Sequence, residues 1–317
     1  MIKIIADSTC DLSDKILKKY NIAIVPLNIM INGKNYKDRV DIEPEKFYQM
    51  LPKLEKLPTT SMPSPGEFSN EYKIAQDQGF DEILCICMSS GTSGSYQSAV
   101  IAQKKYLEEN DNVKIHVVDS KCMSHGSGYL ILKSSLLKEK GATFDELINF
   151  NETYKTNVKH FLSVDDLNNL IKSGRLTNVS AMIGKILRVK PIMSMRNGKG
   201  AIVAKVRGTK KVYEHYINEF KKRVDEELTD FIIIGYTSDL SYAEELKKKL
   251  IEKTNFSQTI YIMQMGVSVG THVGLRGLSM YFIEKGHRHD GLIYNQMNQL
   301  LEKKDEFLKM INRMKKQ

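Results

Sequence analysis

The chain has 317 residues, enough for two ordinary domains, with 41% hydrophobic and 27% charged residues, a composition typical of globular proteins. No apolar run approaches the roughly 20 residues that a membrane span needs, and the first ten residues resemble a strand rather than a signal peptide. The four cysteines form no CxxC pair, which favours a reduced, cytoplasmic protein. These features predict no stable membrane insertion, although they allow transient membrane contact.

The first half of the chain alternates strands and helices. Strands are predicted at 3–7, 22–31, 82–88 and 114–119, and helices at 12–20, 44–51, 95–110 and 128–141. Asn32-Gly33 is typical of a hairpin turn. Cys85 and Cys87 alternate within a strand and are expected to be buried thiols. The order of strand, loop and helix predicts a parallel sheet with helices on its faces.

The second half begins with a change of pattern near residues 151–160. Ser163 and Asp166 have the spacing of a capping box, and Gly174 ends the predicted helix. Further helices are predicted at 211–228, 241–254 and 294–317, with strands at 230–236 and 259–265. We therefore predict an α/β fold of two domains, 1–160 and 161–285, the first with a mainly parallel sheet, followed by a helical extension at 286–317.

Four loops rich in Ser, Thr and Gly follow or adjoin the strands of the first half. They span 7–11, 59–68, 89–95 and 119–128. Ligands of parallel sheets bind at the carboxyl ends of the strands, and hydroxyl and backbone N–H groups there hold anionic or carbonyl oxygens. Any one such loop is ordinary helix capping, and Asp7 is expected to orient its own loop. Four loops together favour a binding site. None has the pattern of a Walker loop or a GxGxxG loop, so no nucleotide cofactor is expected.

A GxSxG pattern at 266–270 keeps a hydrolase as an alternative. Its serine, Ser268, directly follows a predicted strand, where a nucleophile elbow would lie. A triad would also need an acid and a histidine downstream, and only Glu284, His287 and His289 are at hand. We therefore favour a turn of small residues over a catalytic serine.

Positive charge is concentrated between Leu167 and Tyr213, where there is no Asp or Glu. The eleven basic residues of this segment exceed the net charge of +9 for the whole chain. They are Lys172, Arg175, Lys185, Arg188, Lys190, Arg196, Lys199, Lys205, Arg207, Lys210 and Lys211. The segment favours an anionic partner. Nucleic-acid binding is the main alternative, ahead of the hydrolase, but the segment lacks interleaved aromatic residues and any recognised nucleic-acid motif.

Seven short motifs, taken in order, give the chain a resemblance to a known family. The motifs are ADSTCDL, TTSMPSPGEF, SSGTSGSYQSA, SGRL, KPI, KVRGTKK and GTHVG, within residues 1 to 283. The chain resembles the DegV family of bacterial fatty-acid-binding proteins. The resemblance implies two α/β domains that hold a long-chain fatty acid between them, with the acyl chain in an apolar tunnel. It also implies a protein that is not an enzyme, and that presents the carboxylate to a separate ATP-dependent fatty-acid kinase, which makes an acyl phosphate.

The resemblance also assigns roles to individual residues. The carboxylate contacts would come from Thr60, Ser61, Ser93 and His272, with Gly94, Arg175 and Arg276 near the headgroup and no metal or cofactor. Met182, Met193 and Met195 would help to line the tunnel. The chain departs from the family pattern at Leu275 and Arg276, which replace part of a usual Gly-Pro-Gly turn, and at Met62, which replaces a polar residue.

The basic segment would then serve as a docking face for the kinase. Positive charge at the headgroup end would steer an acidic partner and offset the repulsion between carboxylate and γ-phosphate. The leading candidates for this face are Arg175, Arg196, Arg207 and Lys210.

Overall fold

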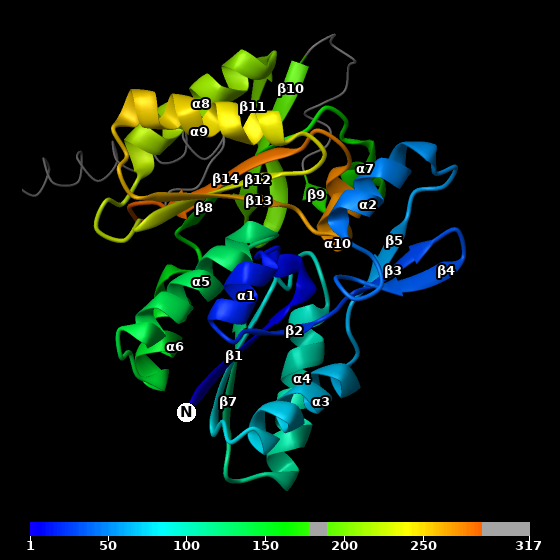
Figure 1. Cartoon of the computed structure of the whole chain (residues 1–317), viewed down its shortest axis with the longest axis vertical. Coiled ribbons are helices and arrows are strands. Elements are labelled where there is room, and N and C mark those ends of the chain that lie inside the picture. Colours follow the sequence, from blue (N-terminus) through cyan, green and yellow to red (C-terminus); the bar gives the residue numbers. More distant parts are fainter. Residues whose placement is uncertain (178–188, 287–317) are drawn as a thin grey trace, which may run out of the picture.

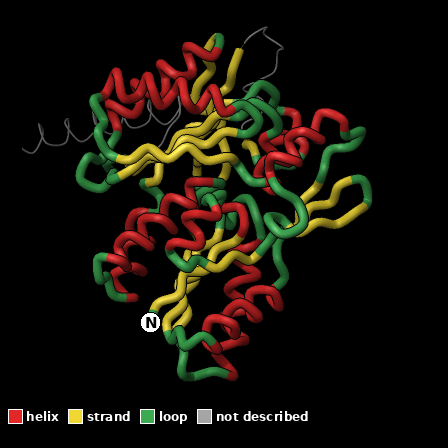
Figure 2. The backbone as a smooth tube through the Cα atoms, viewed as in Figure 1, coloured by secondary structure: helices red, strands yellow, loops and turns green. Residues whose placement is uncertain are grey.

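The computed structural model describes residues 1–177 and 189–286. Within these residues the chain forms three sheets with helices between and around them (Figures 1 and 2). The expected tail helix at 294–317 lies outside the described residues. So do Met182, expected in the tunnel, and Lys185 and Arg188 of the basic segment.

The first sheet is entirely parallel, as the sequence predicts. Its strands lie in the order β2, β1, β6, β7 and span Ala23–Val25, Ile2–Asp7, Glu82–Cys87 and Lys114–Asp119. Alternate side chains point to opposite faces, so that Ile5, Cys85 and Cys87 pack under α3 (Pro65–Asp77) and α4 (Ser95–Glu109). Both thiols are free and buried, as expected.

The other face of this sheet is covered by α1 (Asp14–Lys19), α5 (His125–Glu139) and α6 (Phe144–Tyr154). Helix α5 is buried from its first residue through Ser135, because it also packs against strands of the second sheet. Its Tyr129 ring stacks on Phe231 with the ring centres 4.3 Å apart, and the Tyr129 hydroxyl donates to the Phe231 carbonyl oxygen at 3.0 Å. Helix α5 therefore joins the two sheets into one core (Figure 1).

The second sheet has seven strands of mixed direction in the order β13, β12, β14, β8, β10, β11, β9. They span Thr259–Gln264, Phe231–Tyr236, Leu278–Ile283, Val158–Ser163, Val189–Arg196, Lys199–Arg207 and Leu176–Thr177. Helices α8 (Thr209–Arg223) and α9 (Leu240–Thr254) bury their apolar faces against it. Figure 1 shows these two helices on the side away from α5.

A small antiparallel sheet lies beside the junction of the two larger ones. Its strands β4, β3 and β5 span Lys34–Lys37, Asn28–Ile31 and Thr59–Ser61. The Asn32-Gly33 turn is confirmed, since Ile31 pairs with Lys34 and both turn residues have positive φ. Helices α2 (Pro44–Met50), α7 (Asn168–Lys172) and α10 (Val267–Val273) lie near it in Figure 1, and two short 3₁₀ turns, η1 and η2, span Ser8–Cys10 and Leu51–Lys53.

Two local predictions are wrong. Ser163 does not cap a helix, because it ends strand β8 and pairs with Leu278 and Ile192, and α7 begins only at Asn168. The GxSxG pattern is not a turn, because its residues from Val267 form helix α10. Gly174 follows α7 with a φ of 72°, so the predicted helix end is confirmed. The domain boundary near residue 160 remains a prediction.

We expect the Tyr129→Phe substitution to lower the free energy of unfolding by about 1–2 kcal/mol. The ring packing is kept, but the Phe231 carbonyl loses a buried donor. Urea denaturation monitored by circular dichroism measures the change. Tyr154→Phe, a half-buried ring of the same cluster, is the matched control and should change stability by less than about 0.5 kcal/mol. Equal losses in the two variants would contradict the role given to the Tyr129 hydroxyl.

Candidate functional site

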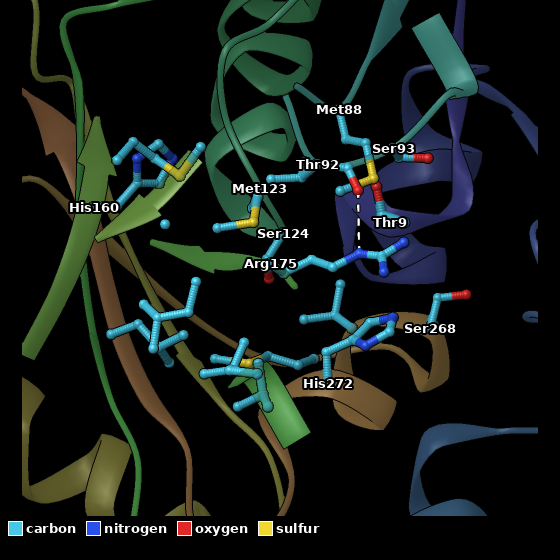
Figure 3. Close-up of a pocket in the computed structure, with 18 of the residues that line it drawn as sticks. Thr9, Met88, Thr92, Ser93, Met123, Ser124, His160, Arg175, Ser268 and His272 are labelled. Carbon is cyan, nitrogen blue, oxygen red and sulfur yellow. Dashed lines mark hydrogen bonds between the residues drawn. The ribbon is translucent and has the colours of Figure 1, made fainter. Parts of the chain in front are cut away.

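A cavity of about 180 Å³ lies between the carboxyl ends of the parallel strands and the second sheet. A cavity needs only about 10–15 Å³ to hold one water molecule, so this cavity can accept a ligand of many atoms. Figure 3 shows side chains from both sides pointing into it.

All four Ser/Thr/Gly-rich loops contribute to this one cavity, as the sequence predicts. The lining residues from these loops include Thr9, Thr60, Thr92, Ser93 and Ser124. The opposite wall comes from β8, β10, α7 and the segment from Met265 to Val273. The site thus lies where the loops of a parallel sheet place it, and it is closed by the second sheet.

Three buried carboxyl groups hold the lining loops in place. Asp7 accepts hydrogen bonds from the backbone N–H groups of Thr9 (3.1 Å) and Met88 (2.9 Å), which joins the loops after β1 and β6. This confirms the orienting role expected for Asp7. Burial raises its pKa, and the bonds from Thr9 and Met88 oppose that shift.

Asp11 joins three segments that are far apart in the sequence. It accepts from the Ser124 hydroxyl at 2.5 Å and from the Gly266 N–H at 2.8 Å. A side-chain carbon on Gly266 would lie 2.6 Å from the Asp11 carboxyl oxygen, so this approach requires glycine. Burial raises the pKa of Asp11 to about 8. Asp38 acts in the same way on the loop after β1, accepting from the Ser8 hydroxyl at 2.8 Å. Ser8 Oγ in turn accepts from the Leu27 N–H at 3.0 Å, in the loop after β2.

The polar end of the cavity contains Thr60 and His272, which come from β5 and α10. The Thr60 hydroxyl lies 2.8 Å from His272 Nε2, within hydrogen-bond distance. Burial, with a smaller effect of the Arg175 charge, lowers the pKa of His272 to about 4. The imidazole is therefore neutral near pH 7, and this pair offers neutral hydrogen-bonding groups rather than a fixed positive charge.

Ser93 and Gly94 form the loop wall beside this pair. Ser93 Oγ accepts from the Ser95 N–H at 3.2 Å and lies 2.9 Å from the Ser95 hydroxyl. A side-chain carbon on Gly94 would lie 2.1 Å from the sulfur of Met62. Met62 is 50% exposed and also lines the cavity, so it lies at the rim where the cavity meets solvent.

Arg175 brings a guanidinium group to the same region, as Figure 3 shows. Its Nε donates to the Thr92 carbonyl oxygen at 3.2 Å, and its Nη1 donates to the Ser173 carbonyl oxygen. Because a guanidinium has five N–H groups, others remain for an anionic ligand. The two backbone bonds fix the position of the charge.

Away from this end the lining is mainly apolar. Leu162, Leu170, Leu176 and Val273 contribute, together with Met123, Met193, Met195 and Met265. Met193 and Met195, which are expected to line the acyl tunnel, both line this cavity. Unbranched methionine side chains adapt to flexible apolar ligands.

Two residues expected at the headgroup do not line the cavity. Ser61 is exposed, because it follows Thr60 in strand β5 and neighbouring strand residues point to opposite sides. Arg276 pairs with Asp165 at 3.1 Å and lies over the ring of Tyr242. His160 on β8 and Tyr281 on β14 also line the cavity, and no local sequence motif predicts them.

The described part of the basic segment is divided between the two ends of the β10–β11 hairpin. Arg196 pairs with Lys199 at one end, where the Gly198 carbonyl oxygen accepts from Ser89. Arg207 pairs with Val189 at the other end, seven residues along the strand, or about 23 Å. Lys210 lies in the first turn of α8, beyond Arg207. The docking face expected from part of this segment, with Arg175, Arg196, Arg207 and Lys210 as leading candidates, stays a prediction.

Ser268, the serine of the hydrolase alternative, lies in the first turn of α10 and is buried. Its hydroxyl lies beside the buried carboxyl group of Asp38. Glu284, the acid that a triad would need, pairs instead with Lys159 and Arg223. His287 and His289 lie outside the described residues.

Within residues 1–177 and 189–286, no cluster of three or more His, Cys, Asp or Glu side chains has the arrangement of a metal site. In the same residues no helix has both the length and the apolar character needed to cross a membrane.

Comparison with known proteins identifies relatives over almost the whole described chain. A DegV domain-containing protein of Clostridium acetobutylicum is 37% identical over 285 residues, covering 90% of this chain and 99% of the relative. A DegV family protein of Thermus thermophilus, described by its fatty acid binding, is 25% identical with a TM-score of 0.81. A stearic acid-binding protein of Eubacterium ventriosum is 27% identical with a TM-score of 0.81. Each of the two structures covers 90% of this chain and 99% of its own.

The family pattern described as "Uncharacterised protein, DegV family" matches residues 1–285. The family is thus supported by sequence and by fold, and the chain belongs to the DegV family.

Proposed function

We propose that this protein binds one long-chain fatty acid in the cavity between its sheets, with the carboxylate at the end formed by Thr60, Ser93, Arg175 and His272. The observation that carries the proposal is the division of one cavity into a polar end and a mainly apolar remainder. Such a shape fits an amphiphile with a small anionic head and a flexible tail. The fatty acids bound by the relatives from Thermus thermophilus and Eubacterium ventriosum support the same ligand class.

The chemistry of the polar end suits a carboxylate that must remain reactive. The Ser93 hydroxyl and the neutral Thr60–His272 pair can donate hydrogen bonds without burying a second full charge against the ligand. The pair uses one proton in its own hydrogen bond and keeps one for the carboxylate. Arg175 supplies one cation, already restrained by two backbone carbonyls. A carboxylate held in this way keeps an oxygen lone pair for attack on a phosphate.

We further propose that the protein presents this carboxylate to a separate fatty-acid kinase. In that reaction a carboxylate oxygen forms a bond to the γ-phosphorus of ATP, the bond between that phosphorus and the bridging oxygen breaks, and ADP leaves. The partly exposed rim at Met62 and Gly94 supports access from outside the protein. We restrict the docking face to this rim, with Arg175 and the exposed Lys172, because Arg207 and Lys210 lie beyond the far end of the hairpin.

Protein purified from a bacterial host is expected to carry one acyl chain per polypeptide. Native mass spectrometry before and after organic extraction measures the bound mass, and analysis of the extract identifies it. A nucleotide or a sugar phosphate in the extract, with no acyl chain, would contradict fatty-acid binding.

We expect Thr60→Val to weaken binding of stearate about five- to thirtyfold, because one headgroup hydrogen bond contributes about 1–2 kcal/mol. Ser93→Ala should have an effect of similar size. Displacement of a fluorescent fatty acid from delipidated protein gives the affinities, and melting temperatures should stay within a few degrees of wild type. Ser61→Ala is the matched control, because it removes the neighbouring hydroxyl that points away from the cavity. If Ser61→Ala weakened binding as much as Thr60→Val, the assignment of the headgroup end would be wrong.

Charge reversal at the rim should slow acyl-phosphate formation without changing fatty-acid affinity. We expect Lys172→Glu to reduce the rate with a purified bacterial fatty-acid kinase at low salt, and the reduction should shrink as salt screens the attraction. Hydroxamate trapping measures the acyl phosphate. Arg207→Glu, the same change in charge at the far end of the hairpin, is the control. Equal slowing by both variants, or by neither, would argue against docking at this rim.

A further inference from the structure

The far end of the cavity contains a buried histidine that the proposed headgroup chemistry does not use. His160 lies in strand β8, is only 6% exposed and lines the cavity. In Figure 3 its ring lies across the cavity from Ser93 and His272. Neither ring nitrogen has a hydrogen-bond partner among the described residues.

An imidazole in this condition has hydrogen-bonding capacity that the protein leaves unused. Burial lowers the pKa of His160 to about 3, so the ring is neutral near pH 7. One ring nitrogen then carries a proton and can donate a hydrogen bond, and the other can accept a hydrogen bond. Buried polar groups of folded proteins nearly always have partners, and each exception needs an explanation. His125, which is also buried, does not line the cavity: its Nδ1 lies 3.3 Å from the Ser124 hydroxyl, and its Nε2 has no hydrogen-bond partner among the described residues.

The surroundings of His160 fix its ring in place. A side-chain carbon on Gly126 would lie 1.8 Å from His160 Nε2, so this nitrogen faces helix α5 across a contact that only glycine permits. Tyr281 packs edge-to-face on the ring with centres 5.2 Å apart. We therefore assign any contact with a ligand to Nδ1.

His160 also lies at the boundary with a second cavity of about 390 Å³. The two cavities share His160, Ser194 and Met195. Lysines line the second cavity, and they are paired with acids, as Lys121 is with Asp119 and Lys155 is with Glu152. Because these charges are balanced, a neutral polar group suits this boundary better than a second anion.

We propose that the preferred ligand is an acyl chain with a hydroxyl group on its distal part, and that this hydroxyl bonds to the imidazole of His160. The inference rests on the proposed function, since it concerns the chain of the same fatty acid. A hydroxyl both donates and accepts, so it satisfies Nδ1 in either tautomer. A plain saturated chain leaves that nitrogen buried without a partner. His160 thereby becomes a specificity-determining residue, at the opposite end of the cavity from the carboxylate.

Competition binding to delipidated protein tests the inference with four C18 acids: stearate and its 2-, 10- and 12-hydroxy derivatives. We expect the better of the 10- and 12-hydroxy acids to bind about five- to tenfold more tightly than stearate, which corresponds to one hydrogen bond to a buried group. The 2-hydroxy acid should show no such gain, since its hydroxyl lies beside the carboxylate. His160→Phe should remove the preference for the distal hydroxy acids over stearate. Met193→Leu, which alters the lining without a polar group, should retain it.

Equal binding of stearate and the distal hydroxy acids to the wild type would overturn the inference while leaving fatty-acid binding intact. So would a preference that persists in His160→Phe, which would place the hydroxyl elsewhere. Failure of all four acids to bind would remove the proposed function itself.

Should His160→Phe not fold, nitrogen NMR of histidine-labelled wild-type protein answers the same question. One imidazole resonance should shift with the preferred hydroxy acid and not with stearate. Identical spectra with the two ligands would again overturn the inference.

Discussion

Of the three buried carboxyl groups that hold the cavity loops, that of Asp11 joins the segments that are farthest apart in the sequence. It accepts from Ser124 at the start of α5 and from Gly266 at the start of α10, segments more than 100 residues away from it and from each other. Asp11 itself has a φ of 55°, a conformation that few residues other than glycine adopt readily. Removing this carboxyl would release both helix starts at once. The loops that line the cavity are therefore ordered by buried polar bonds between distant segments, and the apolar core supplies the layers to which they are attached.

The buried imidazoles give the cavity its electrostatic character. Burial lowers the pKa of His272 to about 4 and that of His160 to about 3, so both rings are neutral near pH 7. Among the described residues that line the cavity, Arg175 is then the one with a positively charged side chain. A single restrained cation attracts a carboxylate, and the neutral donors around it determine its orientation. This division explains how the site can hold an anion firmly without neutralising every oxygen.

Local patterns were sufficient to predict the strands of the parallel first sheet, most helices and the four loops, because these depend on periodicity and on Gly, Ser and Thr. Of the seven strands of the second sheet, only β12 and β13 were predicted. These patterns failed where the structure of a residue depends on partners that are distant in the sequence. Ser163 has a capping sequence, yet β14 and β10 recruit it into a strand. Thr60 and Ser61 are equivalent in sequence, and only the register of β5 turns one hydroxyl inward. Arg276 reaches Asp165, a partner 111 positions earlier, so its distance from the cavity has no local signal. His160 shows its role only through the absence of a partner.

A cavity with polar groups at both ends distinguishes ligands by the spacing of their oxygens as well as by their length. Apolar contacts along the middle are tolerant, since methionine and leucine side chains repack around chains of different shape at small cost. A buried nitrogen is not tolerant, because a chain that fails to meet it leaves the desolvation of that nitrogen uncompensated. Most of the affinity would therefore come from the apolar contacts of the middle, whereas discrimination between acids of equal length would come from the two ends. Selectivity of this kind is a difference in binding free energy between two ligands, and this difference is small compared with the total binding free energy of either ligand.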